Sequence, residues 1–239
     1  MSELDPKEHV RKNKNIASGY ALSTLLKAEP YIDATIELLE AQLDRLSAAG
    51  NEVHFDHWFN YTAFDIVGEI TFSKRFGFVE QGRDIGGSIA NSRWLTLYIA
   101  LTGHMRWVHR LLIGNPIVSA LNLQPANHLF DTCLAAVDDR MKNGKARRDM
   151  MEQWMEMRRT HPDRMEEREI LAAAISNLGA GADTISTTLQ ANLYYLLRHP
   201  NHLVRLREEL DTAQACGELS YIVSHAEAQR LLFLQACVR

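Results

Sequence analysis

The sequence predicts a mostly α-helical protein with little or no sheet, and three observations support that prediction. Apolar residues recur at the helical period along most of the 239 residues, and strictly alternating runs are nearly absent. Proline- and glycine-containing turns separate the periodic segments. Hydrophobic residues make up 46% and charged residues 23% of the chain, close to soluble globular proteins, so a sizeable core can be buried.

The first strong helix is expected to begin at Pro30 and to end at Gly50. Proline is favoured at the first helical position, and glycine commonly ends a helix. Apolar side chains follow on one face of this segment, namely Ile32, Ile36, Leu39, Leu43 and Leu46. Asp56 can cap a second helix, which runs through Phe64 and Ile70.

Residues 94–123 are the most apolar part of the chain. Two arginines and two histidines interrupt them well short of the roughly 20 apolar residues that a membrane-spanning helix needs. These residues are His104, Arg106, His109 and Arg110. We expect core helix plus loop here, with a helix lying on a membrane surface as the alternative.

Further helices are expected in the second half of the chain. The pair Gln124-Pro125 opens one that ends near Asn143-Gly144, and a short amphipathic helix contains Trp154. A long helix is then expected over about residues 168–199, with apolar side chains at helical spacing. Its predicted apolar face consists of Ile170, Ala174, Leu178, Ile185, Leu189, Leu193 and Leu196.

The chain closes with two more helical segments. Pro200 begins the first of them. Ser224 and Glu227 have the spacing of a capping box for the last, which carries Leu231, Leu232 and Leu234 and meets no stop signal before Arg239.

Charge and cysteine content exclude several classes of function. The net charge is −4, with 26 basic and 30 acidic residues interspersed, so no basic footprint for nucleic acid is present. Cys133, Cys216 and Cys237 are widely spaced and predict reduced, structural thiols.

No metal site is predicted, although the chain has ten histidines. The nearest pair is His199 and His202, and Pro200 between them disturbs a regular helical face. No nucleophile elbow and no phosphate-binding glycine loop is present, so neither a hydrolase nor a nucleotide-binding function is supported.

The middle of the long helix departs from normal helix composition. Gly179 and Gly181 each cost about 1 kcal/mol relative to alanine, and Asp183 and Thr184 compete for backbone hydrogen bonds. Small and polar residues also form a stripe at helical spacing, namely Asn177, Gly181, Thr184 and Thr188.

Two interpretations of this stripe remain open from the residues alone. Glycine allows a flat ligand or another backbone to approach closely, and an acid beside an alcohol can deliver protons to a bound ligand. The alternative is a glycine-mediated helix crossing, with a solvated Asp183 and a Thr184 bonded back to its own helix.

The same run resembles the oxygen-activation motif of the cytochrome P450 family. Ala180, Gly181, Asp183 and Thr184 match that motif, whereas Ile185 stands where a further hydroxyl is common. Other segments resemble the family in the same order, at residues 64–72, 76–78, 168–171, 196–200, 203–210 and 226–237. The resemblance covers nearly all of residues 9–239.

The resemblance implies an incomplete, mostly α-helical monooxygenase fold, with residues 1–239 as a single partial domain. The family splits O2 on a haem iron and inserts one oxygen atom into a lipophilic small molecule, with electrons from NAD(P)H supplied by a reductase. By resemblance, Asp183 and Thr184 belong to the proton-delivery network. Ala180 and Gly181 would lie over the haem.

The chain departs from the family in the segments that hold the haem. We expect the Trp-x-x-x-Arg helix to precede Met1 and the Glu-x-x-Arg motif to follow Arg239, and the cysteine-ligand loop is absent from the sequence. Cys133 and Cys237 occupy helical patterns, and Cys216 lacks the flanking Phe and Arg. None of the three is expected to supply the axial thiolate.

Two functional hypotheses follow. The first is part of a monooxygenase of fungal secondary metabolism, not competent by itself, in which residues 94–123 form the lid that the family uses for substrate entry. The second is an inactive helical remnant or an interaction module without catalysis. The family usually resides at the endoplasmic reticulum membrane, but the sequence carries no anchor, so no localisation is predicted.

Overall fold

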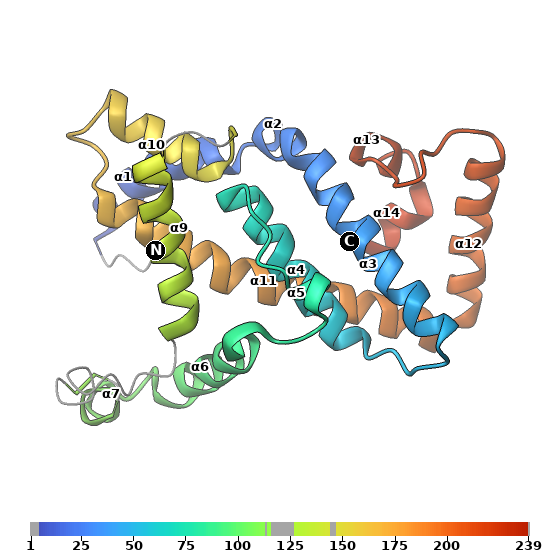
Figure 1. Cartoon of the computed structure of the whole chain (residues 1–239), viewed down its shortest axis with the longest axis horizontal. Helices are drawn as coiled ribbons and strands as arrows, with labels where there is room; N and C mark the ends of the chain where they lie inside the picture. The colour runs from blue at the N-terminus through green and yellow to red at the C-terminus, as the bar shows by residue number, and fades with distance from the viewer. Residues whose placement is uncertain (1–4, 113, 116–126, 144–146, 239) are drawn as a thin grey trace.

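The computed structural model describes residues 5–112, 114–115, 127–143 and 147–238. Every regular element in these ranges is a helix and none is a strand, which confirms the predicted mostly α fold (Figure 1). The helices are α1 (Pro6–Ile16), α2 (Leu22–Leu25), α3 (Glu29–Ala48), α4 (Phe55–Phe72), α5 (Phe78–Gln81), α6 (Ser88–Thr102), α7 (Arg106–Leu111), α9 (Asn127–Asn143), α10 (Met150–Thr160), α11 (Glu167–Arg198), α12 (Pro200–Ala215), α13 (His225–Ala228) and α14 (Leu232–Val238). Short 3-10 turns are η1 (Ala17–Tyr20), η2 (Leu26–Ala28) and η3 (Ile85–Gly87).

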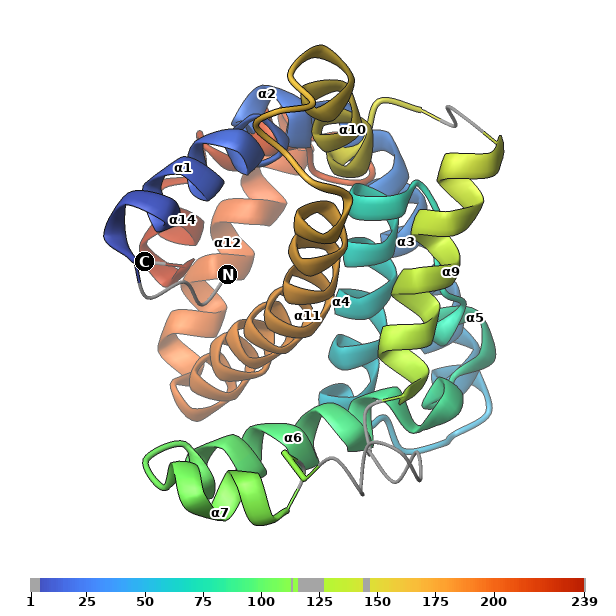
Figure 2. The ribbon, with the colours of Figure 1, turned by 90° about the vertical axis from the view of Figure 1, so that its left-hand side faces the viewer.

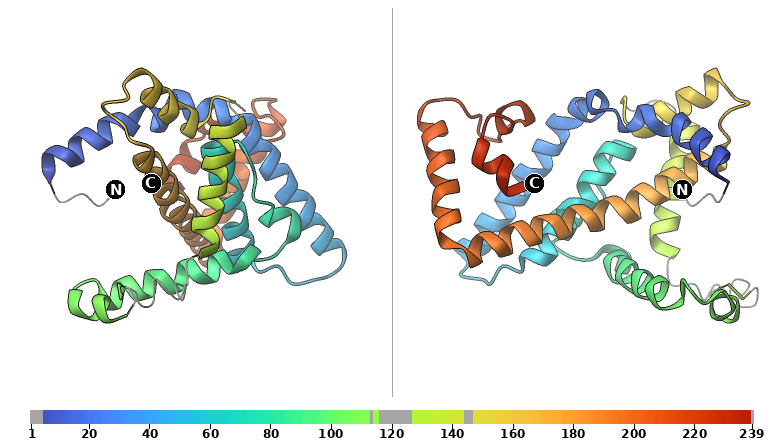
Figure 3. Two further views of the ribbon diagram at one scale, coloured as in Figure 1. Left: turned by 60° about the vertical axis from the view of Figure 1, so that its left-hand side comes forward. Right: turned by 180° about the vertical axis from the view of Figure 1, so that it is seen from behind.

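Helix α11 crosses the whole molecule, as predicted for the long central helix (Figures 1 and 3). Its bounds agree with the expected 168–199. A capping box begins it, because the Glu166 side chain accepts from the third helical amide while Glu169 bonds back to the Glu166 amide. Its buried stripe is Ile170, Ala174, Leu178, Ala182 and Ser186.

The main core lies between α11 and α4. Helix α4 makes the most extensive contact with α11 and is buried over most of its length. Phe64 and Val67 of α4 are almost completely excluded from solvent. Helices α3 and α9 also lie along this pair, and α10 crosses near the start of α11 (Figure 2). Close packing around α4 therefore fixes the middle of α11 in the fold.

The predicted apolar face of α11 is buried only in its first half. Ile170, Ala174 and Leu178 are core residues, but Leu189 is 37% exposed. Helices α4 and α9 lie against the earlier and middle turns of α11, so the later leucines have fewer neighbours among the described residues. The periodicity of the sequence identified the apolar face of α11, but it did not show how much of that face other helices bury.

Several other predicted helices are confirmed. Helix α3 has Pro30 in its first turn, and Gly50 follows it in the left-handed region at φ 69°. Helix α10 is the short amphipathic segment with Trp154 in the core, and α12 begins at Pro200. The expected opening of α9 at Gln124-Pro125 lies outside the described residues.

Two predictions about helix ends were wrong. Helix α4 begins two residues earlier than expected, so His54 is the N-cap and Asp56 lies within the first turn without a capping bond. The last segment is two helices rather than one. The Ser224 capping box starts only the single turn α13, and the carboxylate of Glu209 accepts from the amides of Phe233 and Leu234, which starts α14 anew.

Helices α6 and α7 form an arm, defined here as residues 88–112, that projects from the rest of the molecule (Figures 2 and 3). Its large apolar side chains are exposed, which contradicts the expectation of core for this part of residues 94–123. They are Trp94, Leu97, Ile99, Leu101, Met105, Trp107, Leu111 and Leu112. Among the described residues, no helix is both long and apolar enough to cross a membrane.

Candidate functional site

Gly181 lies at the crossing of α11 and α4. A Cβ atom added to Gly181 would come within 3.2 Å of Cγ2 of Val67. Such a contact is tighter than side chains normally make, so the absence of a side chain lets the two helices approach. Asn177, one turn earlier, also faces α4 and donates to Oγ1 of Thr71 at 2.6 Å. The first half of the small-residue stripe therefore belongs to the helix crossing.

The second half of the stripe is not covered by α4. Thr184 is exposed, and its hydroxyl donates to the carbonyl oxygens of Ala180 at 2.8 Å and Gly181 at 3.2 Å. Thr188 is also exposed and bonds back to the carbonyl of Thr184 at 2.9 Å. Hydroxyls that bond back to the preceding turn compete with the helical ladder and can bend or loosen it. These alcohols are held by their own helix.

Asp183 points toward a different helix. Its Oδ2 atom accepts a hydrogen bond from the hydroxyl of Ser92 on α6 at 2.7 Å. Ser92 is 8% exposed, and Asp183 is half-buried. Asp183 and Thr184 are neighbours in sequence, but their side chains have different partners.

An uncovered surface lies beside the crossing on α11. A Cβ added to Gly179 would meet nothing within 4 Å, and Ala180 is exposed. Together with Thr184, these residues leave a face of small side chains that a flat group could approach.

Of the two interpretations drawn from the sequence, the helix crossing describes Gly181 and the back-bonding describes Thr184. The carboxylate of Asp183 is the exception, because it is bonded to Ser92. Sequence reasoning missed Ser92. A single serine in a mainly apolar segment has no periodic or spacing signal, so only the fold could identify it as the partner of Asp183.

A matched pair of substitutions tests the crossing. Gly181→Leu is expected to lower the free energy of unfolding by about 1–3 kcal/mol, because the new side chain must displace Val67 or separate the two helices. Gly179→Leu has open space and better helix propensity, so it should raise the free energy by roughly 0.5–1 kcal/mol. Urea denaturation of both variants measures the difference. Equal effects would contradict the assignment of Gly181 to the contact.

Cys133, Cys216 and Cys237 are free cysteines in the structure. Cys133 on α9 is buried, and this burial raises the pKa of its thiol to about 12. A thiol of that kind stays protonated and is a poor metal ligand. Cys216 is exposed after α12, and Cys237 is half-buried in α14.

No metal-ligand cluster occurs in the ranges that the structure covers, since these hold no group of three or more suitably placed His, Cys, Asp or Glu residues. The rings of His199 and His202 lie 5.6 Å apart, but Pro200 begins a new helix between them.

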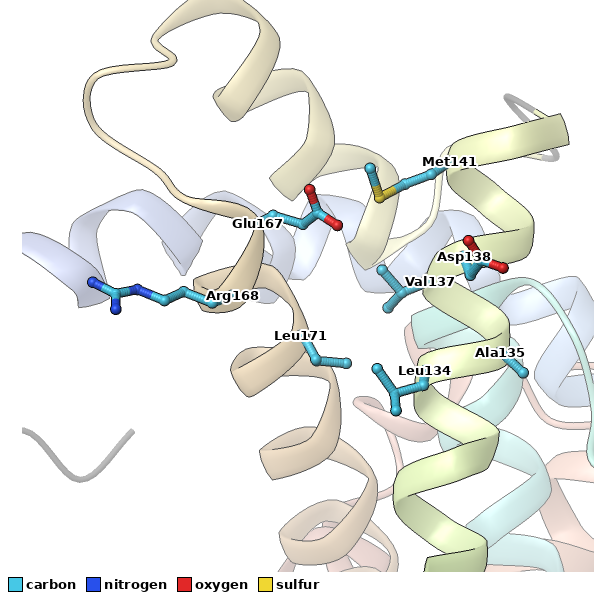
Figure 4. A pocket seen from close by; sticks show the side chains of 8 residues that line it. All are labelled: Leu134, Ala135, Val137, Asp138, Met141, Glu167, Arg168 and Leu171. Carbon is cyan, nitrogen blue, oxygen red and sulfur yellow. The ribbon is translucent and has the colours of Figure 1, made fainter.

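A surface groove of about 660 Å³ lies between α9 and the start of α11 (Figure 4). Apolar side chains form its walls, and charged groups stand at its rim. Its lining residues are Leu134, Ala135, Val137, Asp138, Met141, Glu167, Arg168 and Leu171. The rim charges have partners, because Asp138 pairs with Lys142 and Glu167 with Arg158. None of the lining residues belongs to the segment 180–184.

Comparison of the sequence with known proteins gives evidence on the family of the chain, which the geometry of the site does not provide. The family profile described as Cytochrome P450 matches residues 2–239. A cytochrome P450 monooxygenase of Aspergillus terreus is 34% identical over an alignment that covers 98% of this chain and 50% of the relative. The cytochrome P450 monooxygenase cicH of Emericella nidulans is 31% identical, covering 97% of this chain and 48% of the relative.

A longer relative shows the same similarity. The cytochrome P450 monooxygenase mpaDE of Penicillium roqueforti is 32% identical over 100% of this chain but only 29% of its own length. The chain thus spans about half the length, or less, of these relatives.

Proposed function

The chain belongs to the cytochrome P450 family, and on that premise we propose that the protein oxidises a lipophilic small molecule with O2 and NAD(P)H. A reductase would supply the electrons. The similar proteins are fungal monooxygenases, which supports a place in fungal secondary-metabolite biosynthesis. Because these 239 residues span about half of such relatives, the activity is proposed for a protein that contains them as one partial domain.

We propose Asp183 and Thr184 as the residues that move protons during oxidation. The single observation that carries this role is their position at the middle of α11, where Thr184 is exposed beside Ala180 and Asp183 is bonded to a neighbouring hydroxyl. An acid and an alcohol on successive residues can hold a proton and pass it to a group on the open face.

The residues in the middle of α11 could lie against one face of a haem, but no residue of the chain is proposed as its axial ligand. When bound, haem supplies the iron on which the family reduces O2. Gly179, Ala180 and Thr184 leave a small, uncovered surface that fits a flat ring. Gly181 is proposed to act by allowing α11 to pack closely against α4 at Val67, which fixes α11 so that this surface is presented. None of the three cysteines has the setting of an axial thiolate ligand.

We further propose that the 239 residues alone do not form a competent haem-thiolate site. The buried, protonated thiol of Cys133 supports this proposal. The alternative function is an inactive helical remnant or interaction module, and the exposed apolar side chains of the arm favour it as the second candidate.

A carbon monoxide difference spectrum distinguishes these proposals. The 239-residue chain, reconstituted with haem and reduced, should give no thiolate-type band. A longer reading frame that contains the chain should give that band and oxidise NADPH with a reductase. In this longer protein, Asp183→Asn should reduce product formed per NADPH by about tenfold or more while the band is retained.

The outcomes separate clearly. A thiolate-type band from the 239 residues would contradict their proposed incompetence. Absence of the band from the longer protein would contradict the oxygenase function and would favour the non-catalytic alternative.

A further inference from the structure

A second cavity lies between the end of α4 and helix α9 (Figure 2). Its volume is about 690 Å³, within the range of roughly 300–1,000 Å³ that is typical of small-molecule sites. Its lining residues come from α4, α9 and the turn that follows α4, and none of them lies on α11. The cavity is therefore distinct from the open surface at Ala180 and Thr184.

Buried polar contacts fix one side of this cavity. Arg140 lines it, is only 6% exposed and donates to the carbonyl of Phe72 and to the carboxylate of Asp149. Ser73 also lines it, and its hydroxyl donates to the same carboxylate. Among the described residues, Ser73 is the only one other than glycine with a positive φ, at 60°. Strain of this kind persists only where the surrounding contacts hold it, so the cavity has a preformed shape.

Apolar side chains provide the walls. Phe72 and Phe76 line the cavity at the end of α4, and their rings are packed edge to face with centroids 5.9 Å apart. Ala135 and Ala136 line it from α9. An apolar ring of a ligand can pack against these walls, because aromatic rings favour edge-to-face and offset contacts.

Two opposite charges line the same cavity from different elements. Lys74 follows α4, Asp139 lies on α9, and both are exposed to a ligand. In the part of the chain that the structure describes, neither forms an ion pair with the other or with a third residue. The carboxylate of Asp139 accepts only from the neutral amide of Asn143, at 2.6 Å. The cavity thus presents one cation and one anion that are not neutralised.

We propose that this cavity binds a zwitterionic small molecule with an apolar side chain, of the class of a free aromatic amino acid. The ligand carboxylate pairs with Lys74 and the ligand ammonium with Asp139, while its ring packs against the apolar walls. A ligand with only one charge leaves one of these residues without a partner or facing a like charge, so the pair selects for both groups. The site involves no haem and does not rest on the proposed function.

Three probes of similar size distinguish the charges. The 239-residue chain, with carbon-13 in its alanine methyl groups, is titrated at pH 7 with L-phenylalanine, phenylpropionate or phenylethylamine and followed by nuclear magnetic resonance. L-phenylalanine should shift the methyl signals of Ala135 and Ala136 with a dissociation constant on the order of 1 mM. Phenylpropionate lacks the ammonium and phenylethylamine lacks the carboxylate, so each should bind about fivefold more weakly, the effect of one exposed ion pair.

Substitutions assign each charge to its partner. Lys74→Met should abolish the preference for L-phenylalanine over phenylethylamine, and Asp139→Asn should abolish the preference over phenylpropionate. The matched controls are the sequence neighbours of these residues. Arg75→Met removes a cation whose side chain bonds to α3, and Asp138→Asn removes an acid that is paired within α9. Both controls should leave the three affinities unchanged.

Binding of L-phenylalanine no tighter than that of either analogue would overturn the proposal. So would unchanged affinities in Lys74→Met and Asp139→Asn, or methyl shifts that leave out Ala135 and Ala136. Because the titrations use the chain without haem, such failures leave the spectroscopic test of the oxygenase function unaffected. Conversely, an absent carbon monoxide band in the longer protein would refute that function without refuting this site.

Discussion

Replacing Asp65 by alanine is expected to lower the free energy of unfolding by about 3–5 kcal/mol. The Asp65 side chain is completely buried on α4 and accepts hydrogen bonds from four consecutive amides. Its Oδ1 atom accepts from Phe76 at 2.9 Å, Gly77 at 2.8 Å and Phe78 at 3.3 Å, and Oδ2 accepts from Val79 at 2.9 Å. Alanine would leave these buried donors without partners, each at a cost of roughly 1–3 kcal/mol before the loop relaxes.

The contribution of Asp65 to stability also depends on pH, through the pKa of its carboxyl group. Burial raises the pKa of Asp65, although the four amides oppose that rise. Because the folded pKa lies above the unfolded one, stability from this group is fully present below the unfolded pKa of roughly 3.9. This proton-linked part of the stability is lost as pH rises through the folded value, whereas the hydrogen bonds from the four amides remain. The geometric role of the carboxylate must therefore be measured well above this window, near pH 7.

Urea denaturation at pH 7 checks the Asp65 prediction. The control is Asp56→Ala on the same helix, where the carboxylate is about half exposed and makes no capping bond. That variant should lose no more than about 1 kcal/mol, from the helix dipole. A loss for Asp65→Ala as small as that of the control would show that the loop after α4 does not depend on this carboxylate.

Replacing Arg140 by methionine is expected to cost about 3–5 kcal/mol. Arg140 on α9 is 6% exposed, and Asp149, its partner at the start of α10, is 5% exposed. The guanidinium donates to both carboxylate oxygens of Asp149, at 2.5 and 3.1 Å, and to the carbonyl of Phe72 at 3.0 Å. Methionine fills similar space but leaves a buried carboxylate without its cation.

A second substitution, at Asp149, is expected to restore part of the stability that Arg140→Met loses. Asp149 also caps α10 by accepting from the amide of Glu152, and asparagine can serve as a cap. Arg140→Met combined with Asp149→Asn should therefore recover part of the loss in a double-mutant cycle. The matched control is Lys142→Met on the same helix, whose exposed pair with Asp138 should contribute less than about 1 kcal/mol. Failure of the double variant to recover stability would contradict the buried-charge explanation.

These two residues also mark the limit of sequence reasoning. Asp65 and Arg140 occur in segments with clear helical periodicity, yet each bonds to residues outside its own helix, in the loop at 76–79 and at the start of α10. Local spacing identifies a helix because neighbouring turns repeat, but it holds no information about which amide or carboxylate outside the helix a buried charge will meet. The same applies to Ser92 and Asp183.

The family resemblance rested on matching sequence motifs and not on helical periodicity. An ordered series of short segments, with the run at 180–184 among them, predicted membership in the cytochrome P450 family, and the family profile over residues 2–239 confirmed it. The roles of Asp183, Thr184, Ala180 and Gly181 stay proposals. The structure adds that a Cβ atom at Gly181 would come within 3.2 Å of Val67, a close approach that the helical wheel left open.

The sequence by itself determined that the chain is helical, that one helix of about thirty residues crosses it, and that the middle of this helix is unusual. Those properties follow from apolar periodicity, prolines, glycines and caps, which act over a few residues. Only the tertiary structure decided that α4 covers Gly181 while Thr184 stays exposed, that the arm leaves the core, and that Ser92 holds Asp183. Helices far apart in sequence meet at angles and lengths set by side-chain packing along the whole chain, so no local pattern contains that outcome.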